Sequence, residues 1–249
     1  MGKNKLKRFE ENATFRHLVQ PSYETVVRGA FPLRGRWNED FFDVARPITL
    51  ELGCGRGEYT LALSETQAER NFLGMDVKGA RLWKGAKQSA GQTLRRVGFV
   101  RGRIETLGAL FGQNEVDEIW ITFPDPQLKT RREKKRLTSP GFLHLYGSIL
   151  RPGGCIHLKT DSEELYMYTL RTVQRLGCPI VANVPNVDNA LSAYPYLSVR
   201  TRYEEIFRAR GKAIKYLSFT LPRQLAVSES ELVTPPSLRN TPETIKPSN

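Results

Sequence analysis

The feature that most constrains the fold is an alternation of short apolar runs with longer amphipathic segments, which begins at Pro47. The first run, residues 48–52, is apolar and ends in glycines, which predicts a buried strand. Further strands are expected at 71–77, 97–100, 117–123, 155–160, 180–182 and 213–221, and helices at 58–67, 79–95, 140–150, 162–176 and 201–210. This alternation indicates an α/β fold with a doubly wound, mostly parallel sheet of seven strands.

The two ends of the chain lack this alternation. Residues 1–44 are basic with aromatic residues interleaved, and we expect an irregular arm that lies on the domain. Residues 226–249 are rich in Ser, Thr and Pro without hydrophobic periodicity, which is typical of disorder. The predicted organisation is therefore a basic N-terminal arm at 1–44, a folded domain at 45–222 and a disordered tail at 223–249.

Composition narrows the class of protein and its partners. The chain has 249 residues and a formal net charge of +12, which suits one large domain and favours polyanionic partners. Its three cysteines are widely spaced without a C-x-x-C pair, so neither a disulfide framework nor a zinc cluster is supported. No run approaches the roughly 20 apolar residues of a membrane span, and the N-terminus lacks an apolar signal core. We expect a cytoplasmic protein with no membrane contact.

A glycine-rich loop follows the first strand, with the sequence Glu-Leu-Gly-Cys-Gly-Arg-Gly at residues 51–57. Glycines permit a tight turn and let a ligand approach the backbone. A nicotinamide site would need a further glycine at position 58, but this residue is Glu58, whose charge would oppose a pyrophosphate. Asp76 follows at the end of the second strand, where ribose hydroxyls are held in such folds. The pattern favours a nucleoside without phosphates, such as S-adenosylmethionine.

This loop resembles the E-x-G-x-G-x-G signature of class I methyltransferases, which have a Rossmann-like fold. In this reading Glu51 places a carboxylate near the ammonium or sulfonium of the donor, and Gly53 and Gly55 bring the backbone close to it. Ligands of doubly wound sheets bind at the carboxyl ends of the strands, and both the loop and Asp76 lie at such ends.

A second motif, Phe-Pro-Asp-Pro at residues 123–126, directly follows the fourth strand. The rigid turn would place Asp125 beside the methyl donor. A basic run at residues 129–136 comes next, with six positive charges in eight residues. The prolines could simply end the strand, and a charge run is often only a solvated face. Together, however, the carboxylate and the cations favour an enzyme that acts on nucleic acid.

From about residue 48 to residue 221 the chain resembles the tRNA (guanine-N7-)-methyltransferase family. Beyond the glycine loop and residues 123–126, the motifs that carry the resemblance are Gly74-Met75-Asp76, Lys129, Arg136-Leu137-Thr138, Leu150-Arg151-Pro152-Gly153-Gly154, Leu158-Lys159-Thr160-Asp161 and Thr201-Arg202-Tyr203-Glu204. The resemblance implies methylation of a variable-loop guanine in tRNA, with S-adenosylmethionine as donor, no metal, and a monomer or homodimer.

The resemblance also implies roles for particular residues. It places Glu51 and Asp76 on the donor and Asp125, the candidate catalytic residue, between donor and substrate. The positions on the substrate side are Lys129, Asp161, Thr201, Arg202, Tyr203 and Glu204. Thr201 and Glu204 also have the spacing of a capping box, and Asp161 could cap the next helix.

Two positions depart from the family pattern. Gln127 stands where family members usually carry Trp, so an aromatic contact is either absent or supplied elsewhere. The end of the third strand reads Gly102-Arg103-Ile104 in place of an acidic or amide residue, so we expect the backbone amides of Arg103 and Ile104 to contact the adenine.

Guanine N7 carries a lone pair and no proton, so the reaction needs no general base. Asp125 is instead predicted to accept hydrogen bonds from the guanine N1–H and N2–H groups, which would turn N7 toward the methyl group. Two alternatives stay open: a non-catalytic tRNA-binding subunit on the same fold, and a methyltransferase for a protein or a small metabolite. An NAD enzyme is the weakest alternative, because of Glu58.

Overall fold

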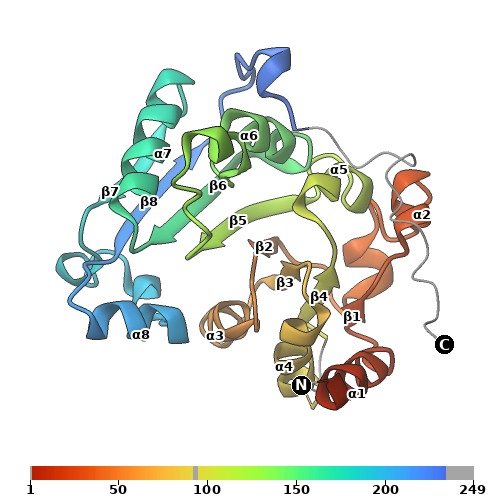
Figure 1. The fold of residues 1–249 in the computed structure, drawn as a ribbon. Helices are drawn as coiled ribbons and strands as arrows, with labels where there is room; N and C mark the ends of the chain where they lie inside the picture. The colour runs from red at the N-terminus through yellow and green to blue at the C-terminus, as the bar shows by residue number, and fades with distance from the viewer. Residues whose placement is uncertain (1, 92–94, 234–249) are drawn as a thin grey trace.

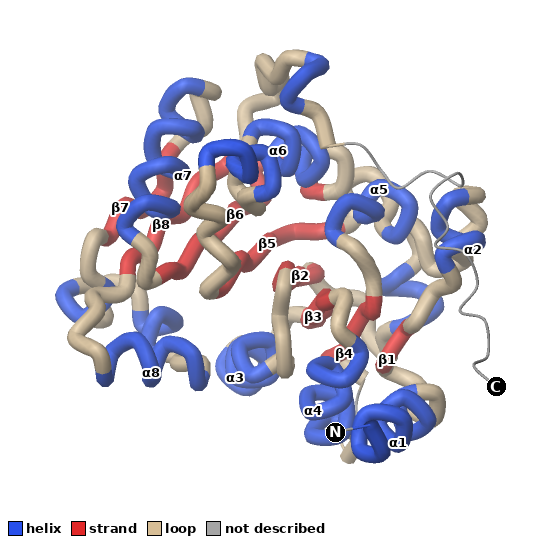
Figure 2. The backbone as a smooth tube through the Cα atoms, viewed as in Figure 1, coloured by secondary structure: helices blue, strands red, loops and turns tan. Residues whose placement is uncertain are grey.

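The computed structural model describes residues 2–91 and 95–233, without the side chains of residues 2–5. In these residues, eight strands form one sheet in the order β1-β4-β3-β2-β5-β6-β8-β7 (Figures 1 and 2). The strands are β1 (Leu18–Val19), β2 (Ile48–Leu52), β3 (Asn71–Asp76), β4 (Val97–Arg101), β5 (Val116–Thr122), β6 (Leu150–Thr160), β7 (Ile180–Val184) and β8 (Lys215–Thr220). Strands β1 to β6 pair in parallel, and β8 pairs antiparallel with both β6 and β7.

Helices cover both faces of this sheet (Figure 1). The helices are α1 (Gly2–Asn12), α2 (Tyr23–Val27), α3 (Glu58–Thr66), α4 (Gly79–Ser89), α5 (Leu107–Leu110), α6 (Pro140–Gly147), α7 (Glu163–Arg175) and α8 (Arg202–Ala209). One core cluster joins Leu50 and Ile119 of the sheet to α5, α6 and α7. The other joins Phe99 and Trp120 to α3, α4 and α8. Successive strand residues bury their side chains on opposite faces of the sheet, so both faces carry a core. The predicted doubly wound fold is therefore confirmed.

The eighth strand comes from the N-terminal arm. Leu18 and Val19 pair with Phe99 and Val100 of β4, which extends the sheet by a short parallel edge. The expectation of seven strands missed it, because two residues give no periodic signal.

The expectation of an irregular arm is also wrong. Residues 2–12 and 23–27 are helical, and a further helical turn spans Trp37–Phe41. Trp37 is completely buried, and its indole Nε1 donates to the carbonyl of Leu110 at 3.0 Å. Helices this short are stabilised by tertiary contacts, which local sequence patterns do not report.

The C-terminal prediction is wrong for the part that the structure describes. Residues 223–233 run along the domain and include a 3₁₀ helix at Glu229–Glu231. Val227 and Val233 pack against the core cluster that contains α6. Residues 234–249 of the predicted tail lie outside the described residues.

Two helix boundaries also differ from expectation. The helix expected at 79–95 ends at Ser89, and residues 92–94 are not described. The helix expected to reach residue 150 ends at Gly147, because β6 already begins at Leu150 and pairs with Val116.

Candidate active site

Most of the predicted site residues lie at the carboxyl ends of strands β2 to β6 or at the start of α8, around two adjoining hollows. Lys129 and Glu204 line neither hollow. The larger is a cleft of about 1010 Å³, lined by the glycine loop, residues 122–126, residues 161–164 and the start of α8. The smaller is a cavity of about 550 Å³, lined by Asp76, Val77, residues 102–105 and part of the basic run. Gly53 lines both, so the two hollows meet at the glycine loop.

The three glycines of the loop all adopt left-handed backbone conformations, with φ of 74° at Gly53, 59° at Gly55 and 72° at Gly57. Side chains other than glycine rarely adopt this region. A Cβ atom on Gly57 would lie 2.4 Å from the ring of Phe99, whereas one on Gly53 or Gly55 would meet no atom within 4 Å. Gly57 thus serves packing, and Gly53 and Gly55 leave the backbone open to a ligand.

Glu51 is buried beneath this loop, with 2% of its surface exposed. Its carboxylate accepts hydrogen bonds from Thr60 N at 2.9 Å, from the Thr60 hydroxyl, and from Thr122 Oγ1 at 2.5 Å. Burial raises the pKa of Glu51, and the hydrogen bonds from the two threonines oppose this effect. The bonds hold a nearly buried carboxylate in one orientation at the wall of the cleft.

Asp76 fastens the loop to the end of β3. Its Oδ2 accepts from Gly55 N at 3.0 Å, and its Oδ1 accepts from Lys78 N at 2.7 Å. The side chain also lines the smaller cavity together with Arg103 and Ile104. Each of the six predicted donor-binding residues therefore lines one of the two hollows, and Gly53 lines both.

The turn at residues 123–127 is bounded by two non-glycine residues with left-handed backbones, Phe123 at φ 46° and Gln127 at φ 47°. Such conformations are strained and tend to occur where a loop is held for function. Asp125 is exposed on the cleft, and its Oδ1 accepts from Gln127 N at 3.0 Å. The turn thereby presents the Asp125 carboxylate next to the glycine loop.

The basic run divides into two parts with different surroundings. Residues 130–135 form a 3₁₀ helix whose four cations are exposed. Arg136, by contrast, is 9% exposed and donates from Nε to the carbonyl of Pro126 at 3.1 Å. Its guanidinium also lies 4.2 Å from the ring centroid of Tyr168. Arg136 therefore supports the turn that carries Asp125 and exposes little surface for a contact with RNA.

Asp161 and the first residues of α8 form the opposite side of the cleft. Asp161 pairs with Lys212 at 2.6 Å. Thr201 caps α8 by accepting from Glu204 N at 3.1 Å. Thr201, Arg202 and Tyr203 all line the cleft.

Glu204 occupies a different environment from the three residues before it. It is completely buried and does not line either hollow. Its carboxylate forms ion pairs with Lys159 at 2.7 Å and with Arg208 at 2.9 Å. The buried Lys159 also donates to the carbonyls of Leu197 and Val199, at 2.9 and 2.7 Å. Glu204 thus attaches α8 to Lys159 of β6.

A row of aromatic rings borders the cleft near Gln127, the residue that stands where family members usually carry Trp. The rings of Phe123 and Phe207 lie 5.9 Å apart, and those of Phe207 and Tyr203 lie 6.5 Å apart at an angle of 26°. Tyr203 is 55% exposed, so one ring of the row faces solvent. Aromatic surface is therefore present beside Asp125 although the chain has Gln127.

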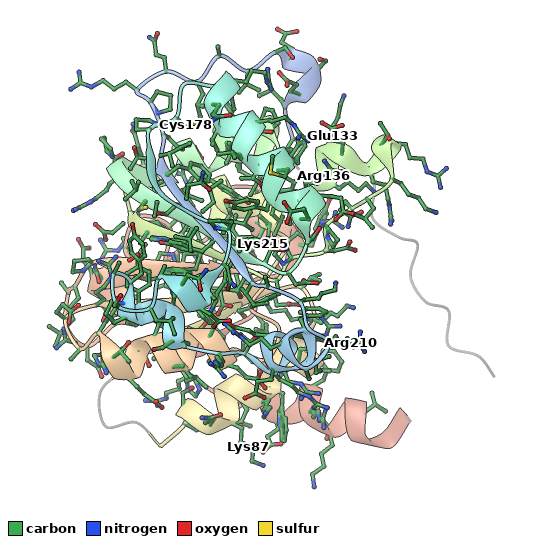
Figure 3. The ribbon with its side chains drawn as sticks, turned by 90° about the vertical axis from the view of Figure 1, so that its left-hand side faces the viewer. Lys87, Glu133, Arg136, Cys178, Arg210 and Lys215 are labelled. Atoms are coloured by element: carbon green, nitrogen blue, oxygen red, sulfur yellow. The ribbon has the colours of Figure 1, made fainter. Side chains whose placement is uncertain are left out.

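Several polar residues of the cleft were not predicted from the sequence: Arg56, Glu58, Arg81, Lys212 and Lys215. Figure 3 shows Arg136 above Lys215 and Arg210 below it. Of these three residues, Lys215 lines the cleft, whereas Arg136 and Arg210 do not. Only a contiguous run of charges marks a basic site in a sequence. Lys212 and Lys215 stand singly, so the sequence did not mark them.

Among the described residues, no group of three or more His, Cys, Asp or Glu side chains is arranged to hold a metal ion. Within the same part of the chain, no helix has the length and apolar character needed to cross a membrane.

The fold resembles solved methyltransferase structures. The 16S rRNA methyltransferase KamB superposes with a TM-score of 0.55 at 14% identity, covering 70% of this chain and 87% of that one. A variant of the 16S rRNA (adenine(1408)-N(1))-methyltransferase from Catenulisporales acidiphilia gives 0.52 at 16% identity, covering 71% and 88%. A doubly wound sheet with this glycine loop and the acidic residues Glu51 and Asp76 defines the class I S-adenosylmethionine-dependent methyltransferases.

Relatives identify the family within this class. Residues 45–217 match the family model described as "Putative methyltransferase". The tRNA (guanine-N(7)-)-methyltransferase of Christiangramia forsetii is 45% identical over 88% of this chain and 98% of its own length. That of Porphyromonas gingivalis is 47% identical, over 84% and 86%. This chain belongs to the tRNA (guanine-N(7)-)-methyltransferase family.

Proposed function

We propose that this protein methylates N7 of a guanine in the variable loop of tRNA, with S-adenosylmethionine as the methyl donor. The observation that carries the proposal is the convergence on one cleft of an open glycine backbone, the buried Glu51, the exposed Asp125 and several cations. The named relatives, which align with most of the chain, support the same reaction.

The donor-binding residues fit the parts of S-adenosylmethionine. Open space above Gly53 and Gly55 allows the methionine end to approach the backbone, and the Glu51 carboxylate attracts its positive charge. Asp76 is placed for the ribose hydroxyls, and the amides of Arg103 and Ile104 for the adenine. The donor supplies an electrophilic methyl group on a sulfonium centre. The protein contributes a fixed position for that group.

Asp125 is the residue that we assign to the guanine. One carboxylate oxygen receives the Gln127 N–H, and the carboxylate retains lone pairs for the guanine N1–H and N2–H groups. Held by that edge, the base would present N7 on its other side toward the methyl group. N7 has no proton to lose, so catalysis rests on alignment and on the exclusion of water.

The flanks of the cleft suit the tRNA around the target base. Lys129 and the exposed cations of residues 130–135 would bind phosphates on one side, and Arg202, Lys212 and Lys215 on the other. The base must leave its stack to reach Asp125, and the exposed ring of Tyr203 offers a surface for stacking. A tRNA substrate also supports a cytoplasmic location for the protein.

Incubation with unmodified tRNA and methyl-labelled donor tests the function directly. Label should appear at one nucleotide, which a cleavage specific for 7-methylguanosine maps to the variable loop. A tRNA with adenine at that nucleotide should stay unlabelled. Binding without transfer would instead support a non-catalytic tRNA-binding subunit, and label on a protein or metabolite would support a methyltransferase for such a substrate. Light scattering of the same sample decides between monomer and homodimer.

A further inference from the structure

The smaller cavity has one wall that the glycine loop and the sheet do not provide. Glu231, Leu232 and Val233 line it, together with Asp76 and residues 102–105. Figure 1 shows the last described part of the chain, in blue, running above α6. We call residues 228–233 the C-terminal segment.

Contacts from separate elements hold the C-terminal segment in place. Lys134 Nζ donates to the carbonyl of Ser230 at 2.7 Å, and Arg175 pairs with Glu231 at 2.8 Å. A capping box joins Ser228 and Glu231. The basic run and α7 both contact the segment, and the capping box joins two of its own residues. The folded domain therefore determines where the segment lies.

Gly141 gives independent evidence for this position. It lies in the first turn of α6, where glycine weakens a helix. A Cβ atom on Gly141 would lie 2.1 Å from the carbonyl oxygen of Glu231. Glycine at this position therefore allows the C-terminal segment to approach the backbone of α6.

The lining of the cavity suits a nucleoside. Its volume of about 550 Å³ falls in the range of small-molecule sites. Asp76 provides an acceptor at one part of the wall, and much of the rest is apolar, with Val77, Ile104, Leu137, Phe142, Leu232 and Val233. Leu232 is 41% exposed although it lines a cavity, so a bound ligand would cover apolar surface that now faces water.

We propose that Leu232 and Val233 form the outer wall of the nucleoside half of the donor site and contact the adenosine of S-adenosylmethionine. This inference rests on the donor arrangement given above. The C-terminal segment then belongs to the binding machinery, and Lys134 connects it to the basic run on which tRNA is expected to bind.

Donor affinity of the full-length chain tests the inference. The variants are Leu232→Asp and Leu232→Ala, and the ligands are S-adenosylmethionine and 5′-methylthioadenosine, which keeps the adenosine but lacks the amino acid end. Calorimetry should show Leu232→Asp weakening both ligands by about tenfold or more and by a similar factor, and Leu232→Ala weakening them less. A loss confined to S-adenosylmethionine would overturn the assignment to adenosine.

Val181→Asp is the matched control, because Val181 is also an exposed apolar residue, at 59%, but lies on β7 away from both hollows. It should leave both affinities unchanged. Unchanged affinities in Leu232→Asp, at an unchanged melting temperature, would show that the segment only packs on α6. Gly141→Ala, which must displace the carbonyl of Glu231, should weaken both ligands as Leu232→Asp does. These outcomes are independent of whether tRNA is the substrate.

Discussion

The carboxylate of Glu58, in the first turn of α3, accepts a hydrogen bond from the backbone N–H of Arg202 at 3.1 Å, across 144 residues of sequence. Its other oxygen pairs with Lys84 at 3.1 Å. Burial opposes the ionisation of Glu58, but these partners outweigh burial and lower its pKa. The helix that follows the glycine loop is thereby joined to the start of α8, which lines the cleft.

Removal of this link should affect tRNA more than the donor. In Glu58→Ala the first turn of α8 loses its contact with α3, and we expect KM for tRNA to rise about threefold to tenfold, as for the loss of one ordinary intramolecular hydrogen bond. Donor affinity should change little. Lys84→Ala, which keeps the bond to Arg202, is the control. Equal effects of the two variants on KM would argue against a role for the Arg202 contact.

Asp125 should be required for transfer but not for donor binding. Asp125→Asn keeps an oxygen for the Gln127 N–H and loses the charge that attracts the guanine edge. We expect kcat/KM for tRNA to fall by about 100-fold or more in Asp125→Asn and in Asp125→Ala. Calorimetry with S-adenosylmethionine should show nearly unchanged affinity. Near-normal turnover of either variant would contradict the assignment.

The basic run should give two different phenotypes. Arg131 and Arg132 are exposed, so the pair of alanine substitutions should reduce the slope of log affinity for tRNA against log salt by about 0.7 to 0.9 per lost phosphate contact. Arg136→Met should leave this slope unchanged and lower turnover, because Arg136 holds the carbonyl of Pro126 beneath Asp125. Filter binding over a salt series measures the slope for each variant, and methyl transfer to tRNA measures turnover. A reduced slope for Arg136→Met would show that this side chain also reaches RNA.

The buried pair of Lys159 and Glu204 should matter for stability. Glu204→Gln leaves the Lys159 charge without its partner, and we expect a loss of about 3 to 5 kcal/mol in the free energy of unfolding. The double variant Lys159→Met/Glu204→Leu should lose less, because no buried charge remains unpaired. Urea unfolding at pH 7 measures both. Equal stability of Glu204→Gln and the parent chain would show that the pair contributes little.

His157 and Glu118 should make stability depend on pH. Burial lowers the pKa of His157, but contacts with Cys155 and Glu118 outweigh it and raise the pKa from 6.5 to about 9. Burial likewise opposes ionisation of Glu118, yet His157 and Arg70 help to lower its pKa from 4.5 to about 2. The histidine contribution is complete below pH 6.5 and is lost as pH rises through 9, and the glutamate contribution is complete above pH 4.5 and is lost as pH falls toward 2.

Urea unfolding of the parent chain should therefore show a decrease in stability between pH 7 and pH 9.5 that is smaller in His157→Gln. His144→Gln is the matched control, since His144 lies on α6 outside this pair. An identical decrease in His157→Gln would assign the pH dependence to other groups.

The sheet and the donor loop were predictable because their signals are local or follow from parallel strand geometry. Apolar runs marked β2, β3 and β5 within a residue or two. Asp76 could be placed near the glycine loop because the carboxyl ends of adjacent parallel strands meet, and it bonds Gly55. The folded N-terminal arm and the C-terminal segment were missed, because their short elements depend on distant partners such as Leu110 and Arg175.

The sequence by itself determined the alternating elements, the glycine loop, the Phe-Pro-Asp-Pro turn and, through its resemblance to a family, the donor and substrate classes. These depend on the order of residues along the chain and on the conformations that glycine and proline allow. Only the tertiary structure separated residues of one motif by their surroundings: Tyr203 is exposed on the cleft while Glu204, the next residue, is fully buried. In the same way, Arg136 is buried although the other cations of the basic run are exposed. Burial depends on what packs against a side chain from distant parts of the chain, and local sequence does not specify it.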